Sequence, residues 1–427
     1  MKICVALHSC MDLGGIINHT EQLIGGLKDL GHEVDLFELV YADRVGSQNK
    51  TGHFEIGPSG IPYDQGKGWN WPIRNRLPYK TNAALNITVQ VLSEYDLVIW
   101  TVPVVPKNKQ HLGNHRWPDL YDLPPTTKQV AFIHDGNCKQ GAPHLYQVAD
   151  KLSGLACVHA CALNGADHLP IPRALVVNPQ KEVFKSIVDW DDRHTGFINM
   201  QTFKAWKHTH DLVKAIAYMP QREMGELREV AGKGIEYQYM TSIDKCKEAY
   251  FHDDPEQFFH SLKIWDTAVF NGMTHHGYWP TKEAENWLQM SRVLVDPSWS
   301  KKYSQVGGHW NRVVVEAMIH GAIPVAQEKG MGRELFLAGE HYVDLGAARD
   351  SQDYADIILH TSNLSTLEAR RYQDNAHDII GMFCRSVVAQ RVVDLAYGNI
   401  ETQTGVTDDK IWSKYEDLMF NQYGVLV

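Results

Sequence analysis

The chain has 427 residues, a length that predicts two domains of about 200 residues each rather than one small fold. Hydrophobic residues make up 44% of the chain and charged residues 22%, a balance that excludes a disordered protein. No apolar run reaches the roughly 18 residues of a membrane span and no signal-like segment stands at the start, so we expect a cytoplasmic protein with no membrane partner. The 7 scattered cysteines are an odd number, which favours reduced thiols over a disulfide framework.

The net charge of -10 is unevenly distributed along the chain. Up to Gln180 there are 15 Lys and Arg against 16 Asp and Glu, whereas the remainder holds 26 against 35. In the first part, the segments Lys67–Lys80 and Lys107–Trp117 contain no acidic residue. Their aromatic residues are Trp69, Trp71, Tyr79 and Trp117. Phosphates attract local cations and an unstacked base stacks on an aromatic ring, so the segments are either a nucleic-acid surface or two solvated loops.

The first half of the chain alternates strand-like and helical segments. Residues 2–8 are a short apolar run, residues 15–30 have apolar side chains at helical spacing, and residues 33–39 form a second apolar run after Gly31. Further strand-like runs follow at Asp96–Val102, Gln129–His134, Gly154–Ala160 and Ala174–Asn178. Because buried parallel strands are continuously apolar, this pattern predicts a doubly wound α/β sheet. Residues 41–81 are too long for a simple connection and are interpreted as a functional insertion.

A second alternating series begins at Thr195. Strands are predicted in TGFINM, IEYQYMT, RVLVDPS and AIPVAQ, and helices in HDLVKAIAYM and NRVVVEAMIH. We therefore predict two Rossmann-like domains, residues 1–180 and 181–405, facing each other across a cleft that holds the ligand. Residues 406–427 are predicted to end in a helix that packs on either domain.

The predicted first domain offers two candidate sites where strands end. Gly14 and Gly15 follow the first strand and open a helix, where backbone N–H groups suit a diphosphate or a sugar. Glu21 lies further along that helix, with a solvated helix face as the alternative interpretation. His134 and Asp135 follow the strand QVAFI, where imidazole and carboxylate can hold or accept the proton of a hydroxyl. An Asp that caps a helix explains the second pair equally well.

The predicted second domain holds cations and a glycine turn. Lys204 and Lys207 follow its first strand, where they would face a diphosphate leaving group unless they are simply solvated. A glycine turn and the following helix contain Gly307, Gly308, Asn311 and Glu316. Glu316 has apolar neighbours and is suited to accept two hydrogen bonds from a ribose diol, the alternative being a solvated helix face.

This last unit resembles the donor site of the retaining GT-B glycosyltransferases, in which a helix Glu binds the nucleotide ribose. A narrower resemblance over most of the chain is to the bacteriophage DNA α-glucosyltransferases, which add glucose from UDP-glucose to hydroxymethylcytosine in DNA. It is carried by MKICVAL, GHEVDLF, Glu21-Gln22, His134-Asp135, Asn178 and Gln180 in VVNPQ, Trp206-Lys207, GIEYQYMTSIDK, and Glu316 in EAMIHGAIPV. Gly308 stands where many members carry another Glu, and Thr202 stands where the narrower family has an Arg.

The resemblance implies a GT-B fold with residues 1–180 as acceptor domain and residues 181–405 as donor domain. It implies retaining transfer of a hexosyl or pentosyl group from UDP-glucose or another UDP-sugar to a hydroxymethylated pyrimidine in double-stranded phage DNA, in the cytoplasm of an infected bacterium. The implied catalytic residues are His134, Asp135 and Glu21. The implied donor-binding residues are Gly14, Gly15, Lys204, Lys207, Tyr239, Met240, Gly307, Gly308, Asn311 and Glu316. The candidate DNA-binding residues are Trp69, Trp71, Arg74, Arg76, Lys107 and Lys109.

We predict no metal in the donor site. The Asp-x-Asp motif Asp189-Trp190-Asp191 lies in a polar stretch before a strand, and Cys157 and Cys161 have the wrong spacing for a zinc knuckle and are interpreted as buried strand residues. Two alternatives to the DNA reading stay open. One is the same transfer to a polysaccharide, lipid or small-molecule acceptor, and the other is a non-catalytic nucleotide- or DNA-binding protein on the same fold.

Overall fold

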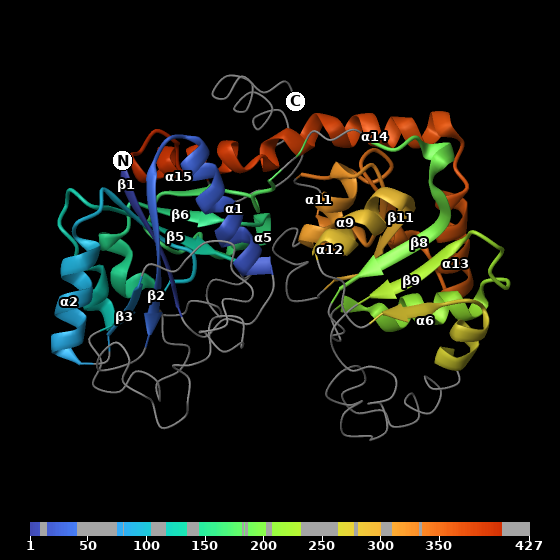
Figure 1. Ribbon diagram of the computed structural model, residues 1–427, viewed down its shortest axis with the longest axis horizontal. Coiled ribbons are helices and arrows are strands. Elements are labelled where there is room, and N and C mark those ends of the chain that lie inside the picture. The colour runs from blue at the N-terminus through green and yellow to red at the C-terminus, as the bar shows by residue number, and fades with distance from the viewer. Residues whose placement is uncertain are drawn as a thin grey trace. The chain divides into compact units, whose positions relative to one another are not determined.

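The computed structural model describes residues 1–8, 15–40, 75–79, 81–103, 117–134, 145–181, 183, 187–201, 207–231, 264–276, 281–299, 310–332 and 335–403. The chain divides into two compact α/β units (Figure 1). Unit 1 contains the described residues up to 181 together with those from Met382 to 403, and unit 2 contains those from Val183 to Gly381.

Unit 1 is built on a parallel sheet of seven strands in the order β3-β2-β1-β4-β5-β6-β7. The strands are β1 (Lys2–His8), β2 (Glu33–Val40), β3 (Asn75–Pro78), β4 (Leu97–Trp100), β5 (Lys128–Ile133), β6 (Gly154–Cys157) and β7 (Arg173–Leu175). The chain moves outward from β1 to β2 and β3, and then returns to the other side of β1 with β4. The carboxyl ends of β1 and β4 therefore mark the point where the strand order reverses, which is the usual ligand site of such sheets.

The helical elements of unit 1 are α1 (Gly15–Asp29), α2 (Asn82–Leu92), η2 (Trp117–Tyr121), η3 (Leu145–Lys151), α5 (Ala160–Gly165) and α15 (Arg385–Ala396). Helix α15 packs against α1 (Figure 1). A Cβ on Gly26 would lie 2.0 Å from the carbonyl oxygen of Arg385, so only glycine permits this approach. The Arg385 guanidinium also donates to both carboxylate oxygens of Asp29, at 2.6 and 2.9 Å.

The second predicted domain extended to residue 405, whereas the structure returns the chain to unit 1 at Met382. Main-chain hydrogen bonds fix this return: Gln180 N donates to Phe383 O at 2.7 Å and Arg385 N donates to Gln180 O at 2.9 Å. The predicted C-terminal helix in residues 406–427 lies outside the described residues.

Unit 2 is built on a second parallel sheet, of six strands in the order β10-β9-β8-β11-β12-β13. The strands are β8 (His194–Met200), β9 (Leu227–Ala231), β10 (Thr274–His276), β11 (Ser291–Asp296), β12 (Ile323–Ala326) and β13 (Val343–Asp344). Its helical elements are η4 (Trp190–Asp192), α6 (Thr209–Tyr218), α9 (Thr281–Met290), α11 (Arg312–Ile319), α12 (Glu328–Met331), η8 (Leu345–Ala347), α13 (Ser351–Ser362) and α14 (Thr366–Ile380). Here the strand order reverses between β8 and β11.

These two sheets and their helices confirm the predicted α/β class. The segment 41–81, interpreted as an insertion, contains strand β3, and Arg76 lies in that strand. Two other local expectations were wrong. Tyr79 and Trp117 are 7% and 3% exposed, so neither ring offers a surface for a base. The strand expected at residues 154–160 ends at Cys157, and Cys161 is buried in α5.

Within the described part of the chain, no helix combines the length and apolarity needed to span a bilayer.

Buried His341 makes the stability of unit 2 depend on pH. Its Nδ1 accepts a hydrogen bond from Leu337 N at 2.9 Å, and burial lowers its pKa from 6.5 to about 4. Between pH 6.5 and about pH 4, His341 is protonated in the unfolded chain but not in the folded one. The contribution of neutral His341 to the free energy of unfolding is therefore complete above pH 6.5 and is lost as pH falls toward 4. We expect the free energy of unfolding contributed by His341 to fall by about 2 kcal/mol between about pH 7 and about pH 5.

Urea denaturation of His341→Gln and the parent at the two pH values measures this difference, with exposed His360→Gln as the matched control. The Gln variant should lose less stability on acidification than the parent and than the control. Parallel losses in all three proteins would contradict the assignment.

Candidate functional site

The first group of polar residues lies at the carboxyl edge of the unit 2 sheet, where the strand order reverses. Gln201 follows β8, Asp296 ends β11, and Asn311 stands at the N-cap of α11. Asn311 does not cap its own helix, because its Oδ1 accepts from the Lys207 ammonium while its Nδ2 donates to Asp296 Oδ2 at 2.6 Å. Asp296 is 3% exposed, and its Oδ1 also accepts from Ser298 N at 3.1 Å. The Asp296 carboxylate therefore fixes the orientation of the Asn311 amide.

Lys207 is held by this group. Its ammonium donates to Asn311 Oδ1. Its carbonyl oxygen accepts from Gln201 Nε2 at 3.0 Å, and Gln201 Oε1 in turn accepts from Ser298 Oγ at 2.7 Å. Two residues that the sequence assigned to donor binding, Lys207 and Asn311, are thus in direct contact.

Glu316 lies one turn into α11 and forms an ion pair with Arg312. The distance from Arg312 Nε to Glu316 Oε1 is 2.7 Å, and the Glu316 side chain is 30% exposed. The carboxylate predicted to bind ribose is therefore accessible, and it has a cation of its own helix as partner.

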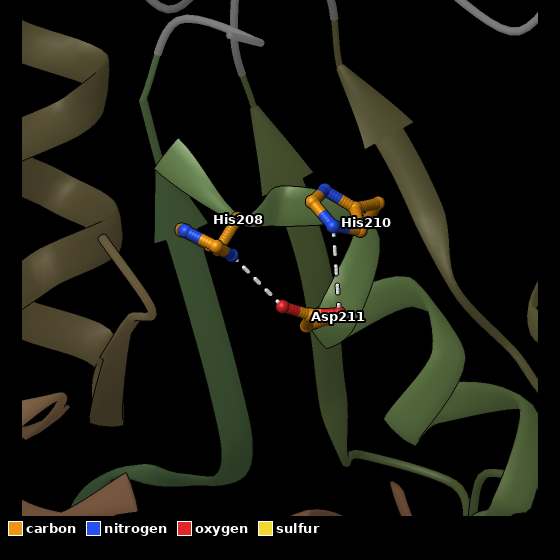
Figure 2. A group of neighbouring side chains, drawn as sticks. All are labelled: His208, His210 and Asp211. Carbon is orange, nitrogen blue, oxygen red and sulfur yellow. Dashed lines mark hydrogen bonds and ion pairs between the residues drawn. The ribbon is translucent and has the colours of Figure 1, made fainter. Parts of the chain in front are cut away.

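His208, His210 and Asp211 gather at the start of α6 (Figure 2). His208 Nδ1 lies 3.0 Å from Asp211 Oδ2, and His210 Nε2 lies 3.5 Å from Asp211 Oδ1. The backbone of His208 is left-handed, with φ of 53°, the single described non-glycine residue in that region. The His208 ring stacks on Trp299, with centroids 5.0 Å apart and planes at 12°.

Burial lowers the pKa of His210 to about 4, and the nearby charges of Lys214 and His208 oppose its protonation while Asp211 favours it. Burial alone would raise the pKa of Asp211. The hydrogen bond from His208 and the charges of His210 and Lys214 outweigh burial, and the pKa of Asp211 is lowered.

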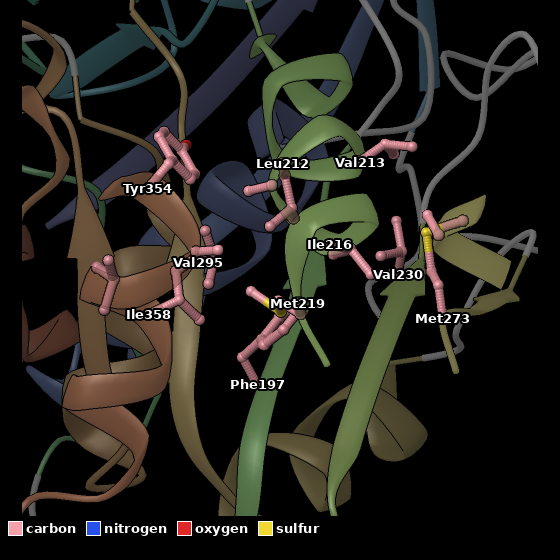
Figure 3. Packing of buried hydrophobic residues seen from close by; sticks show 14 of the residues in the cluster. Phe197, Leu212, Val213, Ile216, Met219, Val230, Met273, Val295, Tyr354 and Ile358 are labelled. Atoms are coloured by element: carbon pink, nitrogen blue, oxygen red, sulfur yellow. The ribbon is translucent and has the colours of Figure 1, made fainter. Parts of the chain in front are cut away.

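Tyr354 belongs to α13, which packs against α6 (Figure 3). It interacts electrostatically with Asp296 of the first group and with Asp211 of the histidine cluster. Its hydroxyl is buried and has no hydrogen-bond partner among the described residues. Burial, together with the negative charges of Asp211 and Asp296, raises the pKa of Tyr354 well above its usual value. The neutral phenol therefore lies within electrostatic reach of both carboxylates, one from each group.

A second group of polar residues lies in unit 1, after β4 and β5. His134 Nε2 lies 3.0 Å from the carbonyl oxygen of Thr101, which can only accept, so Nε2 carries the proton. His19 of α1 contacts the His134 ring edge-on at 4.7 Å between centroids, and its Nδ1 lies 2.9 Å from Asn178 Oδ1. Burial lowers the pKa of His134 to about 4, against the opposing effect of the Thr101 carbonyl. The ring is therefore neutral at neutral pH, with the Nδ1 lone pair unprotonated.

Glu21 also belongs to α1 and is 8% exposed, which contradicts a solvated helix face. Gly15 is the first residue of α1.

The remaining predicted site residues lie outside the described residues: Gly14, Trp69, Trp71, Arg74, Lys107, Lys109, Asp135, Lys204, Tyr239, Met240, Gly307 and Gly308. Arg76 is described only as a backbone position in β3. The Asp-x-Asp motif is exposed at both carboxylates, and Asp191 Oδ2 accepts from Thr366 Oγ1 at 2.7 Å.

Sequence reasoning missed several residues of both groups. No sequence motif marks Asp296, Ser298 or Tyr354 as part of a site. The contact of His19 with Asn178 joins residues 159 positions apart, which a local pattern does not predict. Asp296 does, however, end the apolar strand RVLVDPS, and a polar residue at the end of an apolar strand is the same signal that singles out His134.

No family model and no curated protein matches the chain. Among solved structures it is similar to Anabaena Alr3699/HepE in complex with UDP and glucose, with a TM-score of 0.61 and 15% identity over 93% of this chain and 100% of that one. It is similar to a variant of S. aureus TarM solved with UDP among its ligands, with a TM-score of 0.60 and 11% identity over 92% and 99% of the two chains. A third is an alpha-glucosyltransferase in complex with UDP-glucose and DNA containing an abasic site, with a TM-score of 0.59 and 12% identity over 93% and 99%. These similarities establish the GT-B fold.

Proposed function

We propose that this protein is a glycosyltransferase that transfers a sugar from a UDP-sugar to a hydroxyl group. The observation that carries the proposal is the contact of Lys207 with Asn311, held by Asp296, where the strand order of unit 2 reverses. A cation fixed at the carboxyl edge of a parallel sheet suits a nucleoside diphosphate. Similar structures that contain UDP or UDP-glucose support the choice of nucleotide.

On the donor side, glycosyl transfer releases a diphosphate whose negative charge grows as the bond to the sugar breaks. A preorganised ammonium stabilises that charge more in the transition state than in the ground state. Lys207 has this role in the proposal, with Lys204 as its companion. Glu316 binds the ribose hydroxyls through its half-exposed carboxylate, and its ion pair with Arg312 orients that carboxylate.

On the acceptor side, the proposal assigns His134, Asp135 and Glu21 to the catalytic group. The unprotonated Nδ1 of His134 can accept a hydrogen bond from an acceptor hydroxyl, because Nε2 is committed to Thr101. The neighbouring His19, held by Asn178, keeps the His134 ring in place. We assign the reaction to the retaining class and propose that it proceeds without a change in anomeric configuration.

The proposed acceptor is a hydroxymethylated pyrimidine in double-stranded DNA. Residues 181–427 hold 26 basic against 35 acidic side chains, so the DNA is proposed to bind the nearly neutral part before them. There Lys67–Lys80 and Lys107–Trp117 supply the cations, although Tyr79 and Trp117 are buried and leave Trp69 and Trp71 as the aromatic candidates. Two of the similar structures are alpha-glucosyltransferases solved with DNA, one of which contains an HMU base.

The test is incubation of the full chain with UDP-glucose and other UDP-sugars and with duplex DNA that carries hydroxymethylcytosine or hydroxymethyluracil. Digestion to nucleosides followed by mass measurement should show a base heavier by one sugar, and nuclear magnetic resonance of that nucleoside should show the α configuration retained from the donor. Unmodified cytosine DNA is the matched control.

The same UDP-sugars are then offered with polysaccharide, lipid and small-molecule acceptors. Transfer to one of these but not to DNA would replace the proposed acceptor and leave the enzyme class intact. Binding of UDP or DNA with neither transfer nor hydrolysis of any UDP-sugar would favour the non-catalytic alternative.

A further inference from the structure

The polar cluster His208, His210 and Asp211 has no role in the transfer proposed above. It presents two imidazole nitrogens and a carboxylate oxygen that all lie within 4.8 Å of one another. Among the described residues it is the group whose side chains meet the requirements of a metal site. In Figure 2 both histidine rings are directed at the Asp211 carboxylate from opposite ends.

We propose that His208, His210 and Asp211 bind one divalent transition-metal ion of the zinc class. This inference is independent of the proposed transfer reaction and stands on the placement of three ligand atoms.

The spacing of the ligand atoms suits such an ion. Nitrogen and oxygen ligands about 2.0–2.1 Å from a tetrahedral ion lie about 3.4 Å from one another. His208 Nδ1 lies 3.0 Å from Asp211 Oδ2 and His210 Nε2 lies 3.5 Å from Asp211 Oδ1, both close to that spacing. All three ligand atoms lie within 4.8 Å of one another, so rotation of the side chains can bring both nitrogens and one carboxylate oxygen to a single ion.

The fold fixes both histidines before any ion arrives. The left-handed backbone of His208 and the start of α6 bring positions 208, 210 and 211 to one side of the helix terminus. The stack on Trp299 holds the His208 plane, which lowers the conformational entropy that binding must remove.

The ligand set selects the kind of ion. Imidazole nitrogens favour Zn²⁺, Co²⁺, Ni²⁺ and Cu²⁺, whereas Mg²⁺ and Ca²⁺ prefer a set of oxygens. The side chain of Asp211 is 39% exposed and those of both histidines 19%, so solvent can supply the remaining coordination positions. Three protein ligands with an open position are the arrangement of zinc sites that bind a further group.

Lys214 opposes an ion at this place. Its ammonium lies 3.7 Å from Asp211 Oδ1, one turn further along α6. Removal of that positive charge should therefore strengthen metal binding, a result that nonspecific binding by surface histidines would not give.

The test is titration of the full chain with Co²⁺, followed by visible absorption, and competition of bound Co²⁺ by Zn²⁺. We expect one ion per chain, displaced by Zn²⁺ and unaffected by an excess of Mg²⁺ or Ca²⁺. His208→Gly, which suits the local φ of 53°, and the nearly isosteric Asp211→Asn should each weaken Co²⁺ binding at least about 10-fold. Lys214→Ala should strengthen it about threefold.

The matched control replaces two exposed histidines of the same unit, as His194→Ala with His360→Ala, because the chain has 22 histidines that can bind ions weakly. The control should bind Co²⁺ like the parent. Equal binding by the parent and by both ligand variants, each folded by circular dichroism, would overturn the proposal, as would a parent that binds no Co²⁺ or Zn²⁺.

Discussion

Lys207→Met is expected to lower turnover of UDP-glucose about 100-fold or more, with a smaller loss of UDP affinity. Methionine is also unbranched, is one atom shorter than lysine, and removes the charge. A preorganised charge at the leaving group contributes more to the transition state than to the bound substrate, so the larger effect belongs to kcat. Steady-state kinetics of UDP-glucose consumption, with calorimetry of UDP binding, separates the two quantities.

Asn311→Ala and Asp296→Asn test whether Lys207 is positioned by its neighbours. Both variants keep the Lys207 ammonium. Asn311→Ala removes the amide oxygen that accepts from it, and Asp296→Asn removes the carboxylate charge that orients the Asn311 amide. We expect an intermediate loss of turnover, about 10-fold, because the charge remains and only its placement is weakened. The matched control is Lys282→Met, an exposed lysine on α9. A Lys207→Met enzyme with the kcat of the control would remove Lys207 from the mechanism.

The alternation of apolar runs was sufficient to predict the parallel sheets, because each buried strand is apolar on both faces. β4 illustrates this with all four residues buried. Strand β3 was missed because its sequence, Asn-Arg-Leu-Pro, is short and polar, as the edge of a sheet allows. The return of α15 to unit 1 was also missed. It depends on the close approach of the Arg385 backbone to Gly26, which the spacing of apolar residues along the sequence does not predict.

The candidate site was predictable where a polar residue follows an apolar strand, as for His134 and Lys207. It was not predictable where the partner lies far away in the sequence. Asn311 meets Lys207 across 104 positions, and burial of Trp117 cannot be read from its basic, aromatic surroundings. The pair of Arg312 and Glu316 is different, since a spacing of four residues on a helix predicts such a contact.

His134→Phe is expected to lower sugar transfer about 100-fold and to leave UDP affinity unchanged. Phenylalanine preserves a flat ring beside Phe132 and His19, so packing is kept while both nitrogens are lost. Without Nδ1, no imidazole nitrogen can accept a hydrogen bond from the hydroxyl that receives the sugar when that hydroxyl loses its proton. Transfer to the acceptor is measured by mass of the product, and UDP binding by calorimetry, with exposed His168→Phe as control.

The pH dependence separates a chemical role of His134 from a structural one. Its pKa is lowered to about 4, so the Nδ1 lone pair stays available well below the ordinary histidine value of 6.5 and is lost only as pH approaches 4. Sugar transfer by the parent should therefore show no histidine-like decline near pH 6.5 from this group, and the residual activity of His134→Phe should lack the acidic decline near pH 4. An unchanged rate of transfer in His134→Phe would mean that the ring only fills space between β5 and α1, and that the acceptor hydroxyl is held by other groups.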